Sequence, residues 1–356
     1  MSNVTKIVAL LITLTLTLAA TTAPTYEITA STPVWEVMTR LGKVNVNQLD
    51  PDKKGIARKG QELVMQGFTS NLKGKKTART SPKMPCMACH TLQNEYDNPF
   101  VIDPQKRLEY ADSLDIPFLP GTPFKGIVNR VFFFNDDYQT IFENEDKLLV
   151  KTGHNNIRKA IQGCNTLYAK GRKLDYWEIE SILAFFWTME LKVGELQMPE
   201  DDIDIVKKAI ETNKDNSKAV NIMRRYYREV YPATLITPIA IEKRKKISPI
   251  LNSFSNGKRL YRRACLHCHA NKRYSNYKLD SKQKTFQFLK KNFDKENSYY
   301  SIYTAMRYAP GHKSEKCNAP HFTAERMSDQ QLQDLRFFIT QMARLGDEAY
   351  DYYKNF

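Results

Sequence analysis

Two short stretches of this 356-residue chain share one pattern of thiol and imidazole side chains. Residues 86–90 read Cys-Met-Ala-Cys-His, and residues 265–269 read Cys-Leu-His-Cys-His. In such a motif both thiols can add to the vinyl groups of a haem, and the adjacent His can ligate its iron. The pattern predicts two covalently bound haem c groups. The expected attachment residues are Cys86, Cys89, Cys265 and Cys268, and the expected proximal ligands are His90 and His269.

Three other interpretations of the motifs fit the sequence less well. A redox Cys-x-x-Cys pair belongs in a strand-helix-strand pattern, whereas the sequence around both motifs has helical periodicity. A zinc site needs a further Cys or His pair at ligand spacing, and neither half of the chain has one. Two copies of the motif among only six cysteines argue against coincidence.

The two cysteines outside the motifs, Cys164 and Cys317, occupy equivalent places in the two halves. Each precedes an amphipathic helix with a predicted N-cap, Asp175 in the first half and Ser328 in the second. The caps are 328 − 175 = 153 residues apart, and the cysteines are 317 − 164 = 153 residues apart. This shared offset indicates an internal repeat that places each Cys where small cytochromes commonly have the distal ligand. We expect both cysteines to ligate iron; a disulfide between them, or two inert buried thiols, are the alternatives.

The surrounding elements that would position these residues have helical periodicity, and strand signals are weak throughout. An all-α fold is therefore expected. Phe132 to Phe134 are expected to line a haem pocket. Helices are expected at residues 55–67, near 157–161 and from 175 in the first half, at 220–231 in a connector, and at 254–261, 302–306 and from 328 in the second half.

The first 23 residues have the pattern of a secretory signal. Lys6 is followed by the apolar and Thr-rich run 7–20, and small residues continue to Ala23. The run is shorter than the roughly 20 residues that a membrane-spanning helix needs. We expect cleavage between Ala20 and Pro24 and a periplasmic mature protein, which would contact the membrane only if the signal stayed uncleaved.

The composition and charge narrow the class of partner. The hydrophobic fraction of 42% and the length allow two globular domains, and six cysteines are too few for a disulfide scaffold. Lys and Arg outnumber Asp and Glu by 54 to 39, which gives a net charge of +15. In an exported haem protein this surplus favours an acidic redox partner protein, a respiratory complex or a small sulfur anion, and we expect no nucleic acid partner.

The first half resembles a known class of haem proteins. The motif at 86–90, the segment Ile161-Gln162-Gly163-Cys164, Gly171 and the helix with Trp177 resemble the di-haem cytochromes c, specifically the thiosulfate dehydrogenase type and the haem-bearing A subunit of the sulfur-oxidation complex. The resemblance implies that Cys164 is both an iron ligand and the active-site thiolate. Tyr168 and Ala160 stand where that family pattern has a Ser and a basic residue.

The second half resembles a bacterial cytochrome c domain that ends Met-Pro-x-Phe-Thr-x-Glu-Arg before its last helix. Residues 319–326 read Ala-Pro-His-Phe-Thr-Ala-Glu-Arg, so Ala319 stands where that family has its ligand Met. The repeat offset favours Cys317 as the distal ligand. The alternatives are a five-coordinate iron or ligation by His321, His312 or Met327, of which Met327 is expected to be a core residue.

Together these patterns predict two tandem cytochrome c-like haem domains, residues 50–198 and 251–356. A helical connector, residues 199–250, is expected to pack between them. The preferred function is electron transfer by an exported di-haem cytochrome. The alternative is an oxidoreductase of inorganic sulfur anions, a thiosulfate dehydrogenase or tetrathionate reductase, that uses Cys164 at the first haem.

Overall fold

The regular secondary structure of the described residues is helical, which confirms the all-α prediction. The computed structural model describes residues 26–50, 56–82, 84–133, 151–239, 243, 251–275, 278–293, 301–307 and 321–345. Extended pairing within these ranges is limited to two isolated bridges. None of the helices in these ranges has the length and apolar character needed to cross a membrane. The predicted signal segment, Cys317 and His312 lie outside the described residues.

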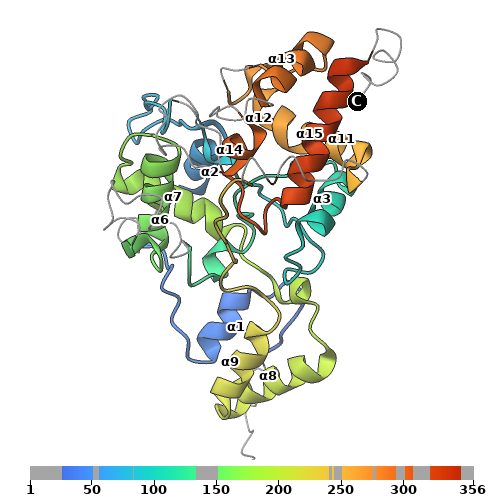
Figure 1. Cartoon of the computed structure of the whole chain (residues 1–356). Helices are drawn as coiled ribbons and strands as arrows, with labels where there is room; N and C mark the ends of the chain where they lie inside the picture. Colours follow the sequence, from blue (N-terminus) through green and yellow to red (C-terminus); the bar gives the residue numbers. More distant parts are fainter. Residues whose placement is uncertain are drawn as a thin grey trace, which may run out of the picture.

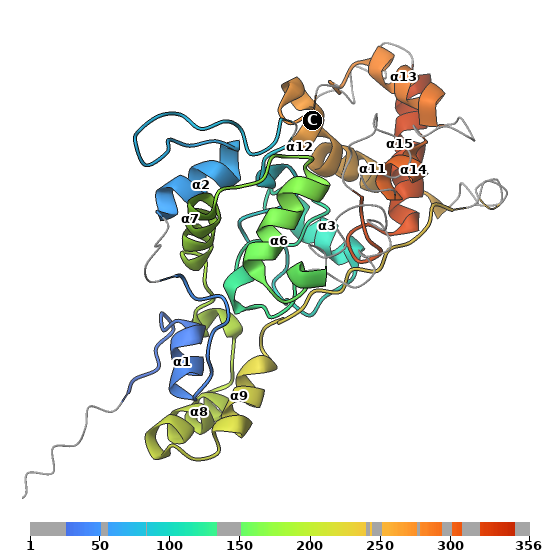
Figure 2. The ribbon, with the colours of Figure 1, turned by 90° about the vertical axis from the view of Figure 1, so that its left-hand side faces the viewer.

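The helices form three groups (Figures 1 and 2). The first group contains α2 (Ala57–Gln66), α6 (Ile157–Gly163), the π-turn η3 (Cys164–Tyr168) and α7 (Tyr176–Trp187). The second contains α3 (Pro104–Ser113), α11 (Phe254–Leu260), the π-turn η6 (Tyr261–Cys265), α12 (Leu266–His269), α13 (Gln283–Phe293), α14 (Ile302–Arg307) and α15 (Asp329–Arg344). The third contains α1 (Val34–Arg40), α8 (Glu200–Thr212) and α9 (Asn216–Arg224), and short 3₁₀ turns lie at Cys86–Ala88, Ile127–Asn129, Val193–Leu196 and Ala270–Lys272.

The predicted repeat is visible in two helix pairs, α2 with α7 and α11 with α15, which cross at a glycine. A Cβ on Gly60 would lie 1.8 Å from the Ser181 carbonyl oxygen, and one on Gly257 would lie 2.1 Å from the Asp334 carbonyl oxygen. Only glycine allows so close an approach of two backbones. Ser181 and Asp334 are 334 − 181 = 153 residues apart, so α7 and α15 are crossed at equivalent positions, whereas the two glycines are 257 − 60 = 197 residues apart.

The helices α7 and α15 begin at the predicted caps. The Glu178 carboxylate accepts a hydrogen bond from the Asp175 amide at 2.9 Å. The Gln331 side chain accepts one from the Ser328 amide at 2.9 Å, while the Ser328 hydroxyl accepts from the Gln331 amide at 3.1 Å. These capping boxes satisfy amide groups that a helix start leaves without partners.

The helix α3 belongs to the first half in sequence but packs in the core of the second. Leu108, Ala111 and Phe118 are buried in one cluster with side chains of α11 and α15. On its polar side, Asp112 accepts hydrogen bonds from Arg262 and from Arg263 Nε, the latter at 2.9 Å. The second core therefore includes a segment that lies about 150 residues earlier in the chain.

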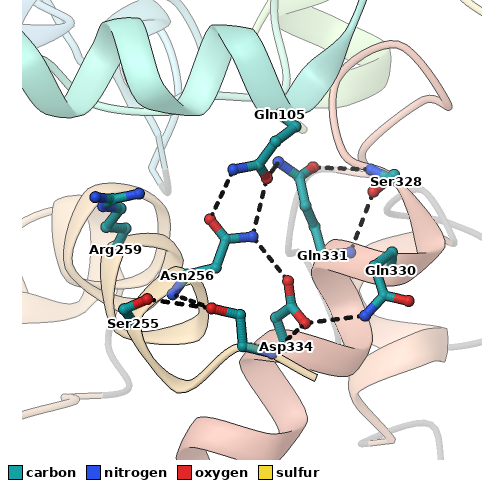
Figure 3. Close-up of a pocket in the computed structure, with 9 residues that line it drawn as sticks. Gln105, Ser255, Asn256, Arg259, Ser328, Gln330, Gln331 and Asp334 are labelled. Atoms are coloured by element: carbon teal, nitrogen blue, oxygen red, sulfur yellow. Dashed lines mark hydrogen bonds between the residues drawn. The ribbon is translucent and has the colours of Figure 1, made fainter. Parts of the chain in front are cut away.

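A polar pocket marks the junction of α3, α11 and α15 (Figure 3). The Gln105 and Asn256 side chains exchange two hydrogen bonds, at 3.0 and 2.9 Å. Asn256 Nδ2 also donates to Asp334 at 2.7 Å, and Gln331 Nε2 donates to the Pro104 carbonyl at 3.0 Å. Because the buried side chains of Asn256, Gln331 and Asp334 find their partners in this network, it fixes α3 on the other two helices.

The connector helices pack elsewhere than expected. Instead of lying between the halves, α8 and α9 form a separate core with α1 at the foot of the molecule (Figure 1). The second connector helix ends at Arg224, before the expected Tyr231. Trp35 of α1 joins this unit to the rest of the chain, because its indole N–H donates to the Val128 carbonyl at 2.9 Å.

The glycine crossings give a direct stability test. Gly60→Ala and Gly257→Ala should each lower the free energy of unfolding by about 1–3 kcal/mol, because the helices must separate to admit a Cβ. Gln61→Ala, at an exposed position of α2, is the matched control and should change little. Denaturant unfolding of the three variants measures the effect, and wild-type stability in both Gly variants would contradict the crossing geometry.

Candidate haem sites

The first motif forms one tight turn that brings its reactive side chains together. The Cys86 carbonyl accepts hydrogen bonds from the amides of Cys89 and His90, both at 3.1 Å. Cys86, Cys89 and His90 line the same cavity as Cys164. The structure thus gathers the four residues that the sequence assigns to the first haem.

This cavity is large and mostly apolar. It contains about 1060 Å³ of space outside protein atoms, its open mouth included. Phe133 lines it as predicted, whereas the neighbouring Phe132 packs on His154, with ring centroids 4.6 Å apart. Its apolar lining includes Leu63, Phe124, Ile127, Ile157, Ile161, Leu174, Ile182 and Phe186. Two thiols, an imidazole and a further thiol in such a cavity fit a covalently attached haem.

His90 is held in the form that suits an iron ligand. Its Nδ1 donates to the Thr122 carbonyl at 2.7 Å, which leaves Nε2 as the ring nitrogen with a lone pair. Burial lowers the pKa of His90 to about 4, so the ring is neutral near pH 7. The ring stacks on Phe124 at 4.5 Å between centroids. A Cβ on Gly121 would lie 2.5 Å from Nδ1, so a glycine is required beside the ring.

Cys164 starts the π-turn η3 directly after α6. It is a free thiol, and burial raises its pKa to about 11. Burial, together with the nearby Cys164, also raises the pKa of Cys86 to about 12. The turn is anchored by Asn165, whose side-chain amide donates to the Thr80 and Arg172 carbonyls at 3.1 and 2.7 Å. A metal that bound Cys164 would displace its proton.

The second motif lies against the first. Cys265 ends the π-turn η6, and Cys268 and His269 lie in α12. His267 Nε2 donates to the Met87 carbonyl at 2.9 Å, and Cys268 Sγ donates to the Ala88 carbonyl at 3.4 Å. Burial and the neighbouring Cys268 raise the pKa of Cys89. Sequence reasoning did not identify His267, because its partner is 180 residues away.

Two of the alternative distal ligands of the second site lie in described residues. Met327 is fully buried in the second core, as predicted for a core residue. His321 is buried as well, and its ring lies 6.0 Å from the ring of Tyr168, a residue that lines the first cavity. Burial and the nearby Arg307 lower the pKa of His321 to about 4. Ligation by Cys317 stays a prediction.

A cluster of buried charges, which sequence reasoning missed, lies beside His90. Glu95 is fully buried and pairs with Arg107 at 3.3 Å and with Arg326 at 2.6 Å. Arg130 lines the haem cavity and donates to the Thr122 hydroxyl at 2.8 Å. The only sequence signal for this cluster was the Glu-Arg pair that ends the pattern at 319–326, and that pattern gave no role to Arg326.

Comparison with known proteins matches part of the chain to a family model. The family model described as cytochrome c554 and c-prime matches residues 264–338, which contain the second motif and most of α15. No protein with a curated function and no solved structure matches the chain. Together with the motif and its helical setting, this match to part of the chain supports a c-type cytochrome, a class of electron-transfer protein with covalently bound haem c.

Proposed function

We propose that this protein is an exported di-haem cytochrome that passes electrons between two haems attached at contacting turns. The hydrogen bond from His267 to the Met87 carbonyl carries the proposal, because it joins the two motif turns. Cys268 Sγ lies 3.4 Å from the Ala88 carbonyl; a thioether at Cys268 would lose the S–H hydrogen bond, while the turns would stay adjacent. Because each haem would be bound through the sulfurs of its motif, attachment at adjacent turns supports a short electron path.

The protein's own side chains would set the properties of the first haem. A bound haem iron supplies the ferric and ferrous states. His90 presents a neutral imidazole oriented by Thr122, and Cys164 presents a thiol that becomes a thiolate on binding. A thiolate donates more strongly than a Met sulfur, so it favours the ferric state and a low reduction potential. The apolar walls limit water and strengthen these interactions.

Haem counting tests the di-haem proposal. The wild-type protein should give two haems per chain in a pyridine haemochrome assay. The double variant Cys86→Ala/Cys89→Ala and its counterpart Cys265→Ala/Cys268→Ala should each give one, because thioether attachment needs the motif sulfurs. A wild-type value of one haem per chain would contradict the proposal.

The thiolate ligand has its own spectroscopic test. Near-infrared magnetic circular dichroism of the oxidised protein should show thiolate-to-iron bands, lost in part in Cys164→Ala because the first iron loses its sulfur donor. Cys317→Ala tests the second haem in the same way. Cys164→Ser keeps the size of the side chain and is the control for packing. Unchanged bands in the Cys164 variants would reject ligation at the first haem.

The partner is proposed to be an acidic redox protein or respiratory complex that docks over the second motif. Residues 254–293 contain eleven Lys and Arg residues and a single acidic residue, Asp280. Among the basic residues of this segment whose exposure the structure describes, the exposed ones are Arg273, Lys278, Lys282, Lys284 and Lys291. Phe288 of α13 is 50% exposed among them, while Phe286 and Leu289 of the same helix are buried in the second core. This pattern supports a charged docking face with one apolar contact.

Charge reversal tests this docking face. The double variant Lys284→Glu/Lys291→Glu should lower the rate of electron transfer with a small acidic redox protein about tenfold at low ionic strength, since electrostatic attraction raises encounter rates. Lys214→Glu/Lys218→Glu, at the foot of the molecule, is the matched control. Stopped-flow kinetics across a salt series measures both. Equal rates in the two double variants at low salt would contradict the assignment.

Oxidation or reduction of a sulfur anion is the alternative function. This alternative is supported by the cavity lining, because the buried Arg130 and the thiol of Cys164 line the same cavity. The positive charge of Arg130 would attract an anion toward the Cys164 sulfur. Turnover of thiosulfate or tetrathionate with an artificial redox partner, lost in Cys164→Ala, would favour this alternative. Absence of turnover at every pH would reject it.

Export would place the mature chain in the periplasm. This part of the proposal rests on the pattern of residues 1–23, and on the covalent attachment expected of the motifs.

A further inference from the structure

We infer that Arg326, in the C-terminal half, is a positioning residue for the proximal side of the first haem site. It would hold the segment Leu119–Thr122 in the place from which that segment orients His90. The inference rests on the proposed attachment of haem at the first motif. Under this inference, Arg326 of the second half controls the orientation of His90 in the first half.

The segment contacts the first motif at two successive residues. The Thr122 carbonyl accepts the Nδ1 hydrogen of His90 at 2.7 Å. The Gly121 amide donates to the Cys89 carbonyl at 2.8 Å, and the ring of His90 lies so close that a Cβ on Gly121 would collide with it. A displacement of this segment would therefore change the direction of the hydrogen bond to His90.

On its other side, the segment accepts several hydrogen bonds from the guanidinium group of Arg326. Arg326 donates from Nε and Nη2 to the Leu119 carbonyl, at 3.1 and 2.8 Å, and from Nη2 to the Gly121 carbonyl. Its Nη1 donates to the Tyr96 hydroxyl at 3.0 Å. The side chain is 4% exposed. A planar group with several fixed N–H directions can make this set of bonds, whereas a Lys ammonium cannot reproduce it.

The charge of Arg326 is balanced within the protein. The Glu95 carboxylate forms ion pairs with Arg326 at 2.6 Å and with Arg107 at 3.3 Å. Burial alone would lower the pKa of Arg326, but Glu95 and Tyr96 raise it above its ordinary value, so the group stays charged. Arg107 Nη1 also donates to the Leu119 carbonyl at 3.1 Å, which anchors the start of the segment.

A role in folding alone must be distinguished from positioning of His90. A buried arginine that only joined two helices would affect the stability of the whole chain without selecting one haem. Arg326 instead donates to the carbonyls of Leu119 and Gly121, which lie directly before Thr122 in the segment that orients His90. We therefore expect its replacement to act on the first haem more than on the second.

The test uses Arg326→Lys in the full-length holoprotein, with Arg344→Lys on the exposed end of α15 as the matched control. The haem of the first motif is identified as the one whose signals are absent from Cys86→Ala/Cys89→Ala. We expect Arg326→Lys to split the electron paramagnetic resonance signal of that haem into more than one species and to shift its reduction potential. The second haem should keep its signal and potential, and the control should change neither haem.

A measurement that does not depend on haem complements the spectra. Hydrogen exchange of the Gly121 amide should be at least about tenfold faster in Arg326→Lys than in the control, because its segment loses charge-assisted hydrogen bonds. Arg326→Gln, which removes the positive charge as well as the guanidinium group, should raise the exchange rate of the Gly121 amide further.

The outcomes separate this inference from the proposed function. A lower melting temperature with both haem signatures unchanged, or an equal change at both haems, would overturn the positioning role. Unchanged exchange at Gly121 would overturn the contact itself. A wild-type protein without haem at the first motif would refute the proposed function, and the exchange measurement would still decide whether Arg326 holds the segment.

Discussion

The buried carboxylate of Glu95 is the interaction on which the arrangement of the two halves depends. It lies five residues after His90 and pairs with Arg107 of α3 and with Arg326, just before α15. Removing one partner of a buried ion pair costs about 3–5 kcal/mol, because a charge is left without compensation. That amount is a large share of the stability of a typical domain. The pairs therefore fix the first motif against elements of the second half.

The packing of α3 also fixes the first half of the chain against the second, over a larger surface than the Glu95 ion pairs. Its apolar face needs a partner surface, and it finds one in the core built around α11 and α15. The polar network of Gln105, Asn256 and Asp334 then fixes the helix in place (Figure 3). The second core is incomplete without a segment of the first half. We therefore expect the halves to fold as an interdependent unit rather than as independent domains.

The first cavity shows how burial prepares neutral ligands. With its apolar walls, the site lowers the pKa of His90 and raises that of Cys164, so that both groups are uncharged before a metal binds. The thiol must then lose its proton to become a ligand, which links metal binding to pH. A covalently attached haem would remain on the unfolded chain, but only in the folded chain would it be buried against the apolar walls of the cavity, so it would also stabilise the fold.

Local sequence determined much of this protein. The capping residues Asp175 and Ser328 and the helical periodicity are properties of neighbouring residues, and they predicted the starts of α7 and α15 and the all-α class. The motif spacing is equally local, and the haem attachment sites that it indicates stay a prediction. The 153-residue offset, read from the caps, also appears in the two helix crossings. These features follow from backbone and side-chain preferences that act within a few turns.

Only the tertiary structure decided how the parts meet. The contact between Met87 and His267, the place of α3 in the second core and the packing of α8 and α9 on α1 join residues far apart in sequence. Arg326 is one of many arginines, and nothing near it in sequence shows that it would be buried against Glu95. Such contacts depend on which apolar faces and which charges find each other when the chain collapses, a condition on the whole molecule that no local pattern contains.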